Sequence, residues 1–443
     1  MKNKQLNAEI ICVGTELLLG QITNTNAVFL GRELANLGVN CLWQTVVGDN
    51  QRRVELAVLN ALERADIVLT TGGLGPTPDD LTHESIASAL NTDLVFDEEV
   101  LEIIKSRFAA INKVMVNSNR KQAFRPQGAQ TLPNSLGTAP GIIWDVSTSY
   151  GAITNLKISH KQVPKQNSKY ILTFPGVPRE LYSMWEETAK PFIQSLATTS
   201  EEIIYKELKF FGIGESDLAE QVSELLNLDD PTIAPLAGRG ECRLRIASKG
   251  IKNKALNKIN KVEQKIKEKV GEYIYGEDTD TLEIVVAREL QKRGQTVSLA
   301  ESCTGGLISK LLTDVPGSSA YTKFNLVTYS NESKTKMLQV SDTSLIKHGA
   351  VSEVVAREMA HGILNLSQSD WGVSVSGVAG PDGGTTEKPI GTVFIGIASK
   401  GGYENVIKLN LGNRSRKDIR WMTALNALNK LRQAIQETEN EIL

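Results

Sequence analysis

The sequence predicts an α/β protein, in which short apolar strands alternate with amphipathic helices around more than one hydrophobic core. Its 443 residues correspond to about three domains at roughly 150 residues each. Hydrophobic residues make up 41% of the chain and charged residues 23%, a balance that is typical of folded globular proteins and excludes global disorder. The alternation of strands and helices indicates right-handed βαβ units and therefore a parallel sheet.

The alternation is clearest in residues 1–197, for which we expect one α/β domain. The run AEIICV at residues 8–13 is rich in β-forming residues. Asn24 or Thr25 then caps a helix that stops at Gly38. The later elements, in chain order, are an extended run at 39–47, a helix at 51–65, a strand at 67–70, a strand at 170–174 and a helix from 178 to 197.

Two stretches of the chain differ in composition from this alternating pattern of strands and helices. Residues 146–169 are polar, and they predict an exposed loop or β-ribbon insertion outside any site. Residues 198–275 combine extended runs with helices, and they predict a small α+β domain. Within them the lysine-rich run 252–270 invites a nucleic-acid interpretation. We favour a helix with a solvated Lys and Glu face, because its apolar residues fall on one stripe and glutamates interleave with the lysines.

Residues 278–443 return to the alternating pattern and predict a third domain, again of α/β class. A helix runs to Arg293, and a strand at 296–299 leads into a glycine-rich turn. The elements expected after this turn are strands at 372–378 and 391–398, separated by a GPDGG turn, and a closing amphipathic helix from Ser415.

The charge balance and the cysteines limit the possible partners. The chain has 49 Lys and Arg against 51 Asp and Glu, so a whole-chain electrostatic footprint for nucleic acid is absent. No apolar run approaches the roughly 20 residues that span a bilayer, and the N-terminus lacks a signal-peptide core. Four scattered cysteines show no metal-ligand spacing. We expect a reduced, cytoplasmic protein without membrane contact, and a homodimer as the common assembly of such proteins.

The first candidate site follows the strand at 67–70. The sequence TGGLGPTPDD, residues 71–80, opens a helix. Gly72, Gly73 and Gly75 let backbone N–H groups turn inward as an anion-binding nest beside a helix N-terminus. The loop therefore suits a phosphate or diphosphate. The alternative is a tight turn with an Asp as helix N-cap.

Carboxylates stand next to this loop. Asp79 and Asp80 are hard oxygen ligands, as a divalent cation that bridges phosphates needs. Glu16 follows the first strand, so it falls at the same carboxyl edge of the sheet, where open α/β sheets bind their ligands. A third glycine-bearing loop, LGTAPG at 136–141, also favours a binding site over a simple turn.

Four segments of this half resemble one known family. AEIICVGTELLLGQITNTNA, TGGLGPTPDDLT, LGTAPG and FPGVPREL are together similar to the N-terminal half of the CinA family (competence/damage-inducible protein). That half resembles the three-layer molybdopterin-binding fold of MoaB and MogA.

The resemblance implies either metal-dependent hydrolysis of ADP-ribose to AMP and ribose 5-phosphate, or handling of a pterin phosphate. We favour the first, because no molybdopterin-specific signal is identified. In this family pattern a Mg-, Mn- or Co-like ion would be held by Glu16, Asp79 and Asp80, and phosphate by Gly72, Gly73 and Gly75.

The middle segment resembles the same family in FGIGES and GECRLR. By this resemblance, Glu241 and Arg243 would reach the nucleotide. The alternative, which we prefer, is that they take part in an internal salt bridge. The insertion at 146–169 departs from the compact family pattern, so the rim of the first site stays undefined.

The second candidate site lies at the glycine-rich turn AESCTGG, residues 300–306. A strand, a sharp turn with a hydroxyl, two glycines and a helix N-terminus form good geometry for a nucleophile that faces backbone donors. Ser302 is one candidate nucleophile. Cys303 is the other, since a thiol at a helix N-terminus can have a lowered pKa.

The identity of the general base distinguishes between Ser302 and Cys303 as the nucleophile. None of the four histidines lies in a glycine loop of this domain, and we expect structural or surface roles for them: His83, His160, His348 and His361. Lys334 follows a strand and a turn and is the better candidate. A Ser–Lys pair needs a neutral lysine, with its pKa lowered by burial or by a cation such as Arg416. Arg416 would equally suit a bidentate grip on a substrate phosphate.

The third domain resembles the C-terminal CinA domain almost segment for segment, in AESCTGGLISKLLTDVPGSSA, VTYSNESK, HGAVSEVVAREMA, SVSGVAGPDGGTTEKPIGTV and NRSRKDIR. That domain is similar to stand-alone nicotinamide-nucleotide amidohydrolases (PncC). The reaction implied is hydrolysis of nicotinamide mononucleotide to nicotinate mononucleotide and ammonia, without a cofactor.

The resemblance also implies roles for single residues. Ser302 would be the nucleophile and Lys334 the base. Hydroxyl groups around the dyad would come from Ser319, Tyr329 and Ser376, the last at a position where many relatives have threonine. Arg416 would hold phosphate, and the turn and glycine positions that contact substrate would be Thr304, Gly305, Gly306 and Gly377.

The sequence thus predicts a three-domain enzyme of pyridine-nucleotide salvage: a nucleotide domain at 1–197, a linking domain at 198–275 and an amidohydrolase domain at 278–443. Two alternatives come from other classes. One is a non-catalytic nucleotide-binding protein. The other is an accessory protein of competence or DNA repair, against which the mild acidity and the lack of an aromatic and basic stripe argue.

Overall fold

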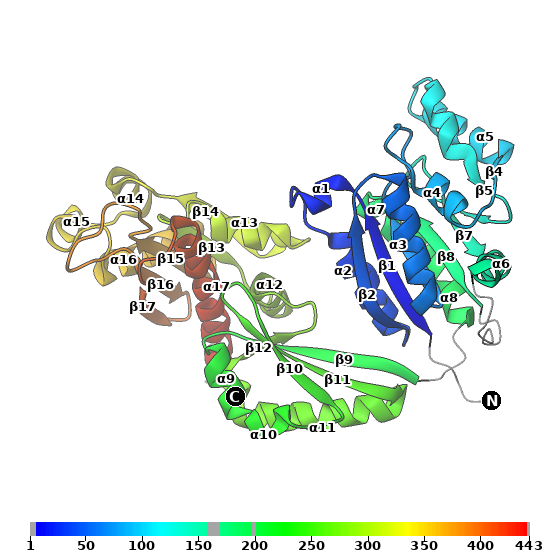
Figure 1. Cartoon of the computed structure of the whole chain (residues 1–443). Helices are drawn as coiled ribbons and strands as arrows, with labels where there is room; N and C mark the ends of the chain where they lie inside the picture. The colour runs from blue at the N-terminus through cyan, green and yellow to red at the C-terminus, as the bar shows by residue number, and fades with distance from the viewer. Residues whose placement is uncertain (1–5, 158–167, 197–200, 441–443) are drawn as a thin grey trace. The chain divides into compact units, whose positions relative to one another are not determined.

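The computed structural model describes residues 6–157, 168–196 and 201–440 (Figure 1). The chain forms two compact units, residues 1–204 with 248–258 and residues 205–247 with 259–443. Both units combine helices with sheets, so the α/β class is confirmed. In the part of the chain that the structure describes, no helix has the length and apolar character needed to cross a bilayer.

The first unit contains a six-stranded sheet in the order β2-β1-β3-β8-β7-β6. Four neighbouring strands run parallel: β2 (Asn40–Val47), β1 (Asn7–Val13), β3 (Ile67–Thr71) and β8 (Tyr170–Phe174). The antiparallel strands β7 (Gly141–Asp145) and β6 (Gln130–Leu132) complete one end. The parallel core of the sheet is as the sequence predicts.

Helices cover both faces of this sheet, which gives three layers (Figure 1). Alternate strand residues point to opposite faces. Ile10 packs in one core with α2 (Thr25–Asn36) and α7 (Pro178–Met184), whereas Ile11 packs in the other with α3 (Gln51–Arg64) and α4 (Thr82–Ala89). The remaining helices of the unit are α1 (Thr15–Leu18), α5 (Glu98–Ala110), α6 (Ser147–Lys157) and α8 (Lys190–Leu196), with η1 (Asn117–Ala123), η2 (Trp185–Ala189) and the pair β4 (Leu94–Phe96) and β5 (Phe124–Pro126).

Local signals explain where the helices begin. The side chain of Asn24 accepts a hydrogen bond from the backbone N–H of Ala27 and caps α2, and Asn50 caps α3 through the N–H of Arg53. Gly38 follows α2 with a φ of 70°, a left-handed conformation that glycine adopts without strain. The predicted cap and stop of α2 are both confirmed.

The predicted loop or β-ribbon at 146–169 is wrong for its first half. Val146 is fully buried, and α6 follows it directly. At the other end, Lys169 Nζ donates to the carbonyl of Ala65 at 2.7 Å. The polar composition hid this helix, because one buried anchor gives no periodic apolar pattern. Residues 158–167, which include His160, lie outside the described residues.

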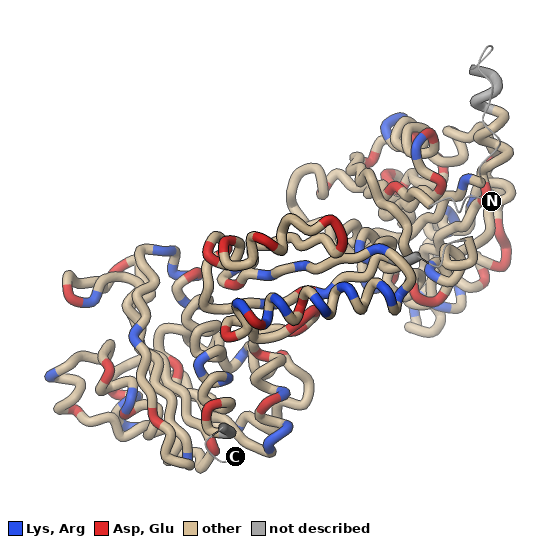
Figure 2. The backbone as a smooth tube through the Cα atoms, turned by 90° about the horizontal axis from the view of Figure 1, so that it is seen from below, with Lys and Arg blue, Asp and Glu red and all other residues tan. Residues whose placement is uncertain are grey.

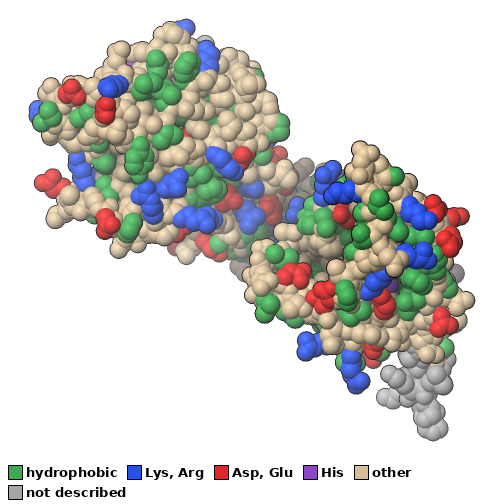
Figure 3. All heavy atoms as spheres, turned by 90° about the horizontal axis from the view of Figure 1, so that it is seen from above, with side chains coloured by type: hydrophobic (Ala, Val, Ile, Leu, Met, Phe, Trp, Pro, Cys, Tyr) green, Lys and Arg blue, Asp and Glu red, His purple; other side chains and the backbone are tan. Residues whose placement is uncertain are grey.

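The middle segment forms a four-stranded sheet in the order β10-β11-β9-β12. Its elements are β9 (Glu201–Phe210), α9 (Glu215–Gln221), α10 (Ser223–Leu226), β10 (Thr232–Ala237), β11 (Cys242–Ile251), α11 (Lys252–Val270), η3 (Gly271–Tyr273) and β12 (Ile274–Glu277). The buried stripe of α11 includes Ile259, Val262, Ile266 and Val270, as predicted. Figure 2 shows basic positions repeated along this helix, and Figure 3 shows side chains of both charges on the visible face of each unit.

The last segment has a five-stranded sheet in the order β14-β13-β15-β16-β17. β13 (Val297–Glu301) is parallel to β14 (Thr322–Val327) and β15 (Trp371–Gly377), and the antiparallel strands β16 (Thr392–Ser399) and β17 (Glu404–Asn410) follow. One face packs against α12 (Leu282–Arg293), α13 (Leu307–Asp314) and α17 (Arg416–Asn440), and the other against α14 (Asn331–Leu338), α15 (Asp342–His348) and α16 (Glu353–Ser367). The short helix η4 (Ser318–Ala320) precedes β14.

Candidate active sites

Ser302 and Lys334 meet at the carboxyl edge of the last sheet. Ser302 directly follows β13, and its N–H donates to the carbonyl of Val375 in β15 at 3.0 Å. Lys334, on α14, is almost fully buried, and its Nζ lies 3.2 Å from Ser302 Oγ. Nζ also donates to the carbonyls of Thr328 at 2.9 Å and Tyr329 at 3.3 Å. The predicted proximity of hydroxyl and amine is therefore present, with the amine held in place by two backbone contacts.

Burial lowers the pKa of Lys334, which is the direction that a general base requires, while nearby Cys303 acts in the opposite direction. The contribution of Arg416 to this shift stays a prediction. Its guanidinium donates to the carbonyl of Gly380 at 2.8 Å and to the hydroxyl of Tyr329 at 2.9 Å. Arg416 is exposed at the head of α17, where an anion can reach it.

Cys303 is a poor nucleophile in this structure. Its side chain is 5% exposed and belongs to the hydrophobic core. Burial raises the pKa of the thiol to about 12, so the thiolate is scarce at neutral pH. Of the two candidates that the turn offers, the structure favours Ser302.

Glu301 anchors this turn, and the sequence analysis missed it. Its carboxylate is buried and accepts the backbone N–H groups of Ile308 at 3.1 Å and Ser309 at 2.7 Å, together with the Ser309 hydroxyl at 2.7 Å. The contacts tie the end of β13 to the first turn of α13. A helix cap normally lies beside the helix, whereas Glu301 is several residues away, so spacing alone did not reveal it.

We expect Glu301→Gln to destabilise the protein by about 1–3 kcal/mol, because the amide NH₂ would face backbone donors and leave them unsatisfied. Thermal or urea unfolding measures this loss. Glu332→Gln is the matched control, since the Glu332 side chain is 72% exposed on α14. Equal unfolding free energies for the two variants would contradict the anchoring role.

The other predicted residues of this site have structural roles in the fold, and their contact with a substrate stays a prediction. Gly305 and Gly306 have φ angles of 58° and 90°, so the turn into α13 needs glycine at both positions. Thr304 is buried, and its carbonyl accepts from Arg420 Nη2 at 2.6 Å. Gly377 allows close strand packing, because a Cβ there would lie 2.6 Å from the side chain of Val393.

Ser376 and Ser319 do not make the predicted contacts with the dyad. Ser376 lies in β15 beside Ser302, but its hydroxyl donates to the carbonyl of Ala350 at 2.7 Å. Ser319 lies in η4, before β14 begins. Because β13 and β14 are parallel, residues before β14 lie at the opposite sheet edge from residues after β13, roughly 13 Å of strand away. Within this chain, the prediction for Ser319 is wrong.

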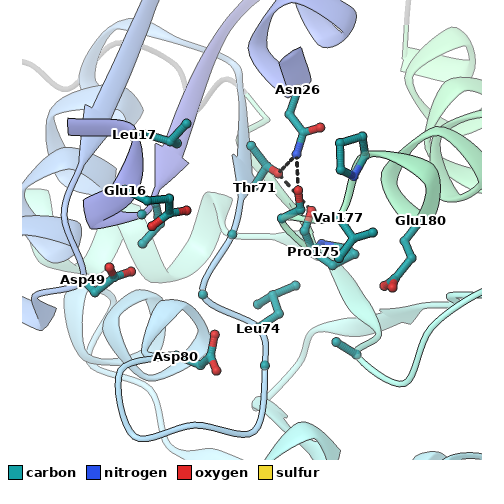
Figure 4. A pocket seen from close by; sticks show the side chains of 18 of the residues that line it. Glu16, Leu17, Asn26, Asp49, Thr71, Leu74, Asp80, Pro175, Val177 and Glu180 are labelled. Atoms are coloured by element: carbon teal, nitrogen blue, oxygen red, sulfur yellow. Dashed lines mark hydrogen bonds between the residues drawn. The ribbon is translucent and has the colours of Figure 1, made fainter. Parts of the chain in front are cut away.

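The first unit has an open cleft of about 660 Å³ at the carboxyl ends of β1, β3 and β8 (Figure 4). All six predicted residues line it: Glu16, Gly72, Gly73, Gly75, Asp79 and Asp80. Asp49 and Glu180 line it as well, and the sequence analysis missed both, because neither belongs to a glycine motif. In Figure 4, Glu16, Asp49 and Asp80 lie on one side of the cleft and Glu180 on the other.

The glycine loop has the conformation expected of a nest. Gly72 and Gly73 have φ angles of 101° and 66°. A Cβ on Gly72 would lie 2.1 Å from the carbonyl oxygen of Val13, and one on Gly73 would lie 2.4 Å from the hydroxyl of Thr82. Both positions therefore require glycine, and the backbone between them stays close to the end of β1.

The carboxylates do not converge as predicted for a metal. Among the residues that the structure describes, no three His, Cys, Asp or Glu side chains are placed to hold one ion. Asp80 Oδ2 instead accepts the N–H of Thr77 at 2.9 Å, and the Glu16 carboxylate lies over Gly14, where a Cβ would be 2.5 Å from it. Glu16, Asp79 and Asp80 as arranged do not fit the three-carboxylate site, and the divalent ion stays a prediction.

Glu241 and Arg243 have internal partners. The hydroxyl of Tyr275 donates to Glu241, and Arg243 Nη1 lies 3.4 Å from Glu207 Oε2. The preferred interpretation, an internal salt bridge, is confirmed for Arg243. The salt bridge joins it to Glu207 rather than to Glu241.

The described histidines have structural or surface positions, as predicted. His83 is buried and its ring lies 2.9 Å from the Thr173 hydroxyl, and burial lowers its pKa to about 4. His361 lies 2.6 Å from Glu404 at the surface. The backbone of His348 accepts from Lys388. None of these contacts involves Ser302.

Comparison with known proteins finds three family models that match successive parts of the chain. Family models match as "Probable molybdopterin binding domain" over 9–195, "Damage-inducible protein CinA KH domain" over 205–276 and "CinA C-terminal domain" over 279–435. The CinA-like protein of Gloeothece citriformis is 48% identical over 432 residues, covering 97% of this chain and 99% of the relative. The CinA-like protein of Nostoc sp. is 46% identical over 440 residues, covering 97% and 99%.

The solved structures that are similar match single portions. One is the competence/damage inducible protein CihA from Agrobacterium tumefaciens, at 40% identity and a TM-score of 0.34. It covers 34% of this chain and 93% of its own.

Proposed function

Because the chain belongs to the CinA family, we propose that its C-terminal domain hydrolyses the carboxamide of nicotinamide mononucleotide to nicotinate mononucleotide and ammonia. The observation that carries this proposal is the 3.2 Å contact between Ser302 Oγ and the buried amine of Lys334. A hydroxyl beside a lysine of lowered pKa is the arrangement that nucleophilic acyl transfer needs.

The proposed reaction has two halves. Ser302 Oγ attacks the carboxamide carbon, and its proton passes to Lys334 Nζ. When the tetrahedral intermediate collapses, the C–N bond breaks, and the Lys334 ammonium donates a proton to the leaving amine, so that ammonia departs from an ester on Ser302. A water molecule then attacks this ester with Lys334 as base, and nicotinate mononucleotide leaves while Ser302 regains its proton.

Two other features support this assignment. The turn of residues 303–306 follows the nucleophile directly, and its backbone N–H groups that have no bond within the turn suit the developing oxyanion; the N–H groups of Gly305, Ile308 and Ser309 are bonded to Ser302 and Glu301. Arg416, exposed and joined to the hydroxyl of Tyr329, suits the nucleotide phosphate. The direct test is release of ammonia from nicotinamide mononucleotide by the purified chain. No release from folded protein would reject the proposal.

We expect the deamidation rate to rise with pH and then level off. Lys334 is active when neutral, so kcat/KM falls as the pH drops below the pKa of this amine, which burial places below the usual lysine value of about 10.4. A pH profile of kcat/KM locates the inflection. Lys336→Met is the control, because it removes an exposed lysine of the same helix and should leave the inflection in place. A profile that falls with rising pH would contradict the role of Lys334.

For the N-terminal domain, we propose hydrolysis of ADP-ribose, or of a related nucleoside diphosphate sugar, in the acidic cleft. The glycine loop at the end of β3 supports a phosphate at this edge of the sheet. The match to a molybdopterin-binding model keeps a pterin phosphate as the second candidate.

We expect Asp80→Ala to abolish AMP formation from ADP-ribose while leaving deamidation within about twofold, because Asp80 lines the cleft and holds the loop through Thr77. Chromatography of the products measures both activities in one preparation. Assays with EDTA, Mg²⁺, Mn²⁺ and Co²⁺ test the predicted ion. Unchanged AMP formation in the variant would reject this site.

A further inference from the structure

The side-chain amide of Asn26 has its nitrogen bonded to the protein, whereas its oxygen has no partner among the described residues. The residue lies on α2, is 7% exposed and lines the cleft of the first unit. Its Nδ2 donates to the Thr71 hydroxyl at 2.9 Å and to the carbonyl of Gly176 at 2.9 Å. Its Oδ1 has no hydrogen-bond partner among the described residues. Figure 4 shows this oxygen turned away from the two bonds that hold the nitrogen.

The orientation of the amide is determined by its neighbours. The Thr71 hydroxyl donates its own proton to the carbonyl of Pro175 at 3.0 Å, so it can only accept from Asn26. A flipped amide would place its oxygen against the carbonyl of Gly176, where two acceptors repel. Oδ1 is therefore a buried acceptor that the protein leaves unsatisfied, which is unfavourable without a ligand.

The surrounding cleft is also rich in acceptors. No Lys, Arg or His is among its described lining residues. Five carboxylates line it: Glu16, Asp49, Asp79, Asp80 and Glu180. Carboxylates and a free amide oxygen accept hydrogen bonds and do not donate them. Such a lining therefore favours the N–H and O–H donors of a ligand over its acceptors.

We propose that Asn26 Oδ1 is a specificity contact that accepts a hydrogen bond from an N–H or O–H group of the nucleoside portion of the ligand. The inference rests on the proposed nucleotide chemistry of the cleft. In a ligand of that class, the donor is the exocyclic amine of the base or a ribose hydroxyl. A site that pairs with a donor rejects an analogue that lacks it, because the buried acceptor is then left unsatisfied.

The test measures binding rather than turnover, with α,β-methylene ADP-ribose, whose bridge resists hydrolysis. Calorimetry in Mg²⁺ buffer compares this probe with three analogues: hypoxanthine in place of adenine, 2′-deoxyadenosine in place of adenosine, and 3′-deoxyadenosine in place of adenosine. We expect the full-length wild-type chain to bind one analogue at least about tenfold more weakly than the probe.

Two variants assign that loss. Asn26→Ala removes the acceptor and should bring the probe and the sensitive analogue within about twofold of each other. Thr71→Val is the matched control, since it removes one support of the amide but keeps Oδ1, and it should retain most of the discrimination. Circular dichroism and thermal melting check that both variants are folded.

The outcomes separate the inference from the proposed activity. Equal binding of all four compounds by the wild-type chain, no binding of any, or unchanged discrimination in Asn26→Ala would overturn the role of Asn26. Preserved discrimination without any hydrolysis of ADP-ribose would support the contact and reject only the proposed diphosphatase activity.

Discussion

Ser302→Ala is expected to lower the rate of nicotinamide mononucleotide deamidation by at least about 10⁴-fold, since the variant has no oxygen to form the acyl-enzyme. Ser302 is partly exposed at the end of β13 and has its Oγ contact with Lys334, so its loss should leave the fold intact. An ammonia assay under saturating substrate, together with a thermal melt, measures both effects.

The neighbouring thiol provides the control. Cys303→Ala should retain kcat within a few-fold, because the buried Cys303 side chain packs into the core and its raised pKa keeps it protonated. It should lose some stability through the small cavity that it leaves. If Cys303→Ala is inactive while Ser302→Ala works, the nucleophile is the thiol and the proposed dyad is wrong.

The residues at the carboxyl edges of the two sheets could be predicted, because their positions depend on local sequence. Buried strands followed by glycines and polar residues place Ser302 and the glycine loop of residues 72–75 at carboxyl strand ends, where α/β sheets gather their ligands. Lys334 could be assigned because it follows the adjacent parallel strand, β14, and returns toward the same edge. In these cases the order of elements along the chain determines the position.

Other residues depended on contacts that the chain order does not specify. Ser319 is close to Lys334 in sequence, but a parallel crossover places it at the opposite edge from Ser302. The anchoring role of Glu301 follows only from its contacts with α13, which its place in the sequence does not indicate. Asn26 carries no motif, and its value as an acceptor follows only from the partners that fix its nitrogen.

In the acidic cleft, the positions of the charged residues could be predicted, but the directions of their side chains could not. Glu16, Asp79 and Asp80 could be predicted to face one cleft, since each follows a strand or glycine loop. Their side-chain directions depend on neighbours such as Thr77, which holds Asp80 within its own loop. Spacing therefore predicted the lining of the cleft but could not predict convergence on an ion.

Lys334→Met is expected to reduce kcat by about 10²–10⁴-fold, the range that general base catalysis usually contributes. Methionine fills a similar volume in the buried pocket and cannot accept the proton of Ser302. Removing a buried amine also removes its desolvation cost, so stability should not fall sharply despite the lost contacts to Thr328 and Tyr329. The measurement is kcat for deamidation above the wild-type inflection, where the base is neutral.

Lys336→Met on the same helix is the matched control. Lys336 is 71% exposed and pairs with Glu332 at the surface, where an ion pair contributes little. Its replacement makes the same substitution on α14 without entering the site, so kcat and the pH profile should stay at wild-type values. Equal losses in both variants would attribute the effect of Lys334→Met to a general disturbance of the helix rather than to the proton that Ser302 must release.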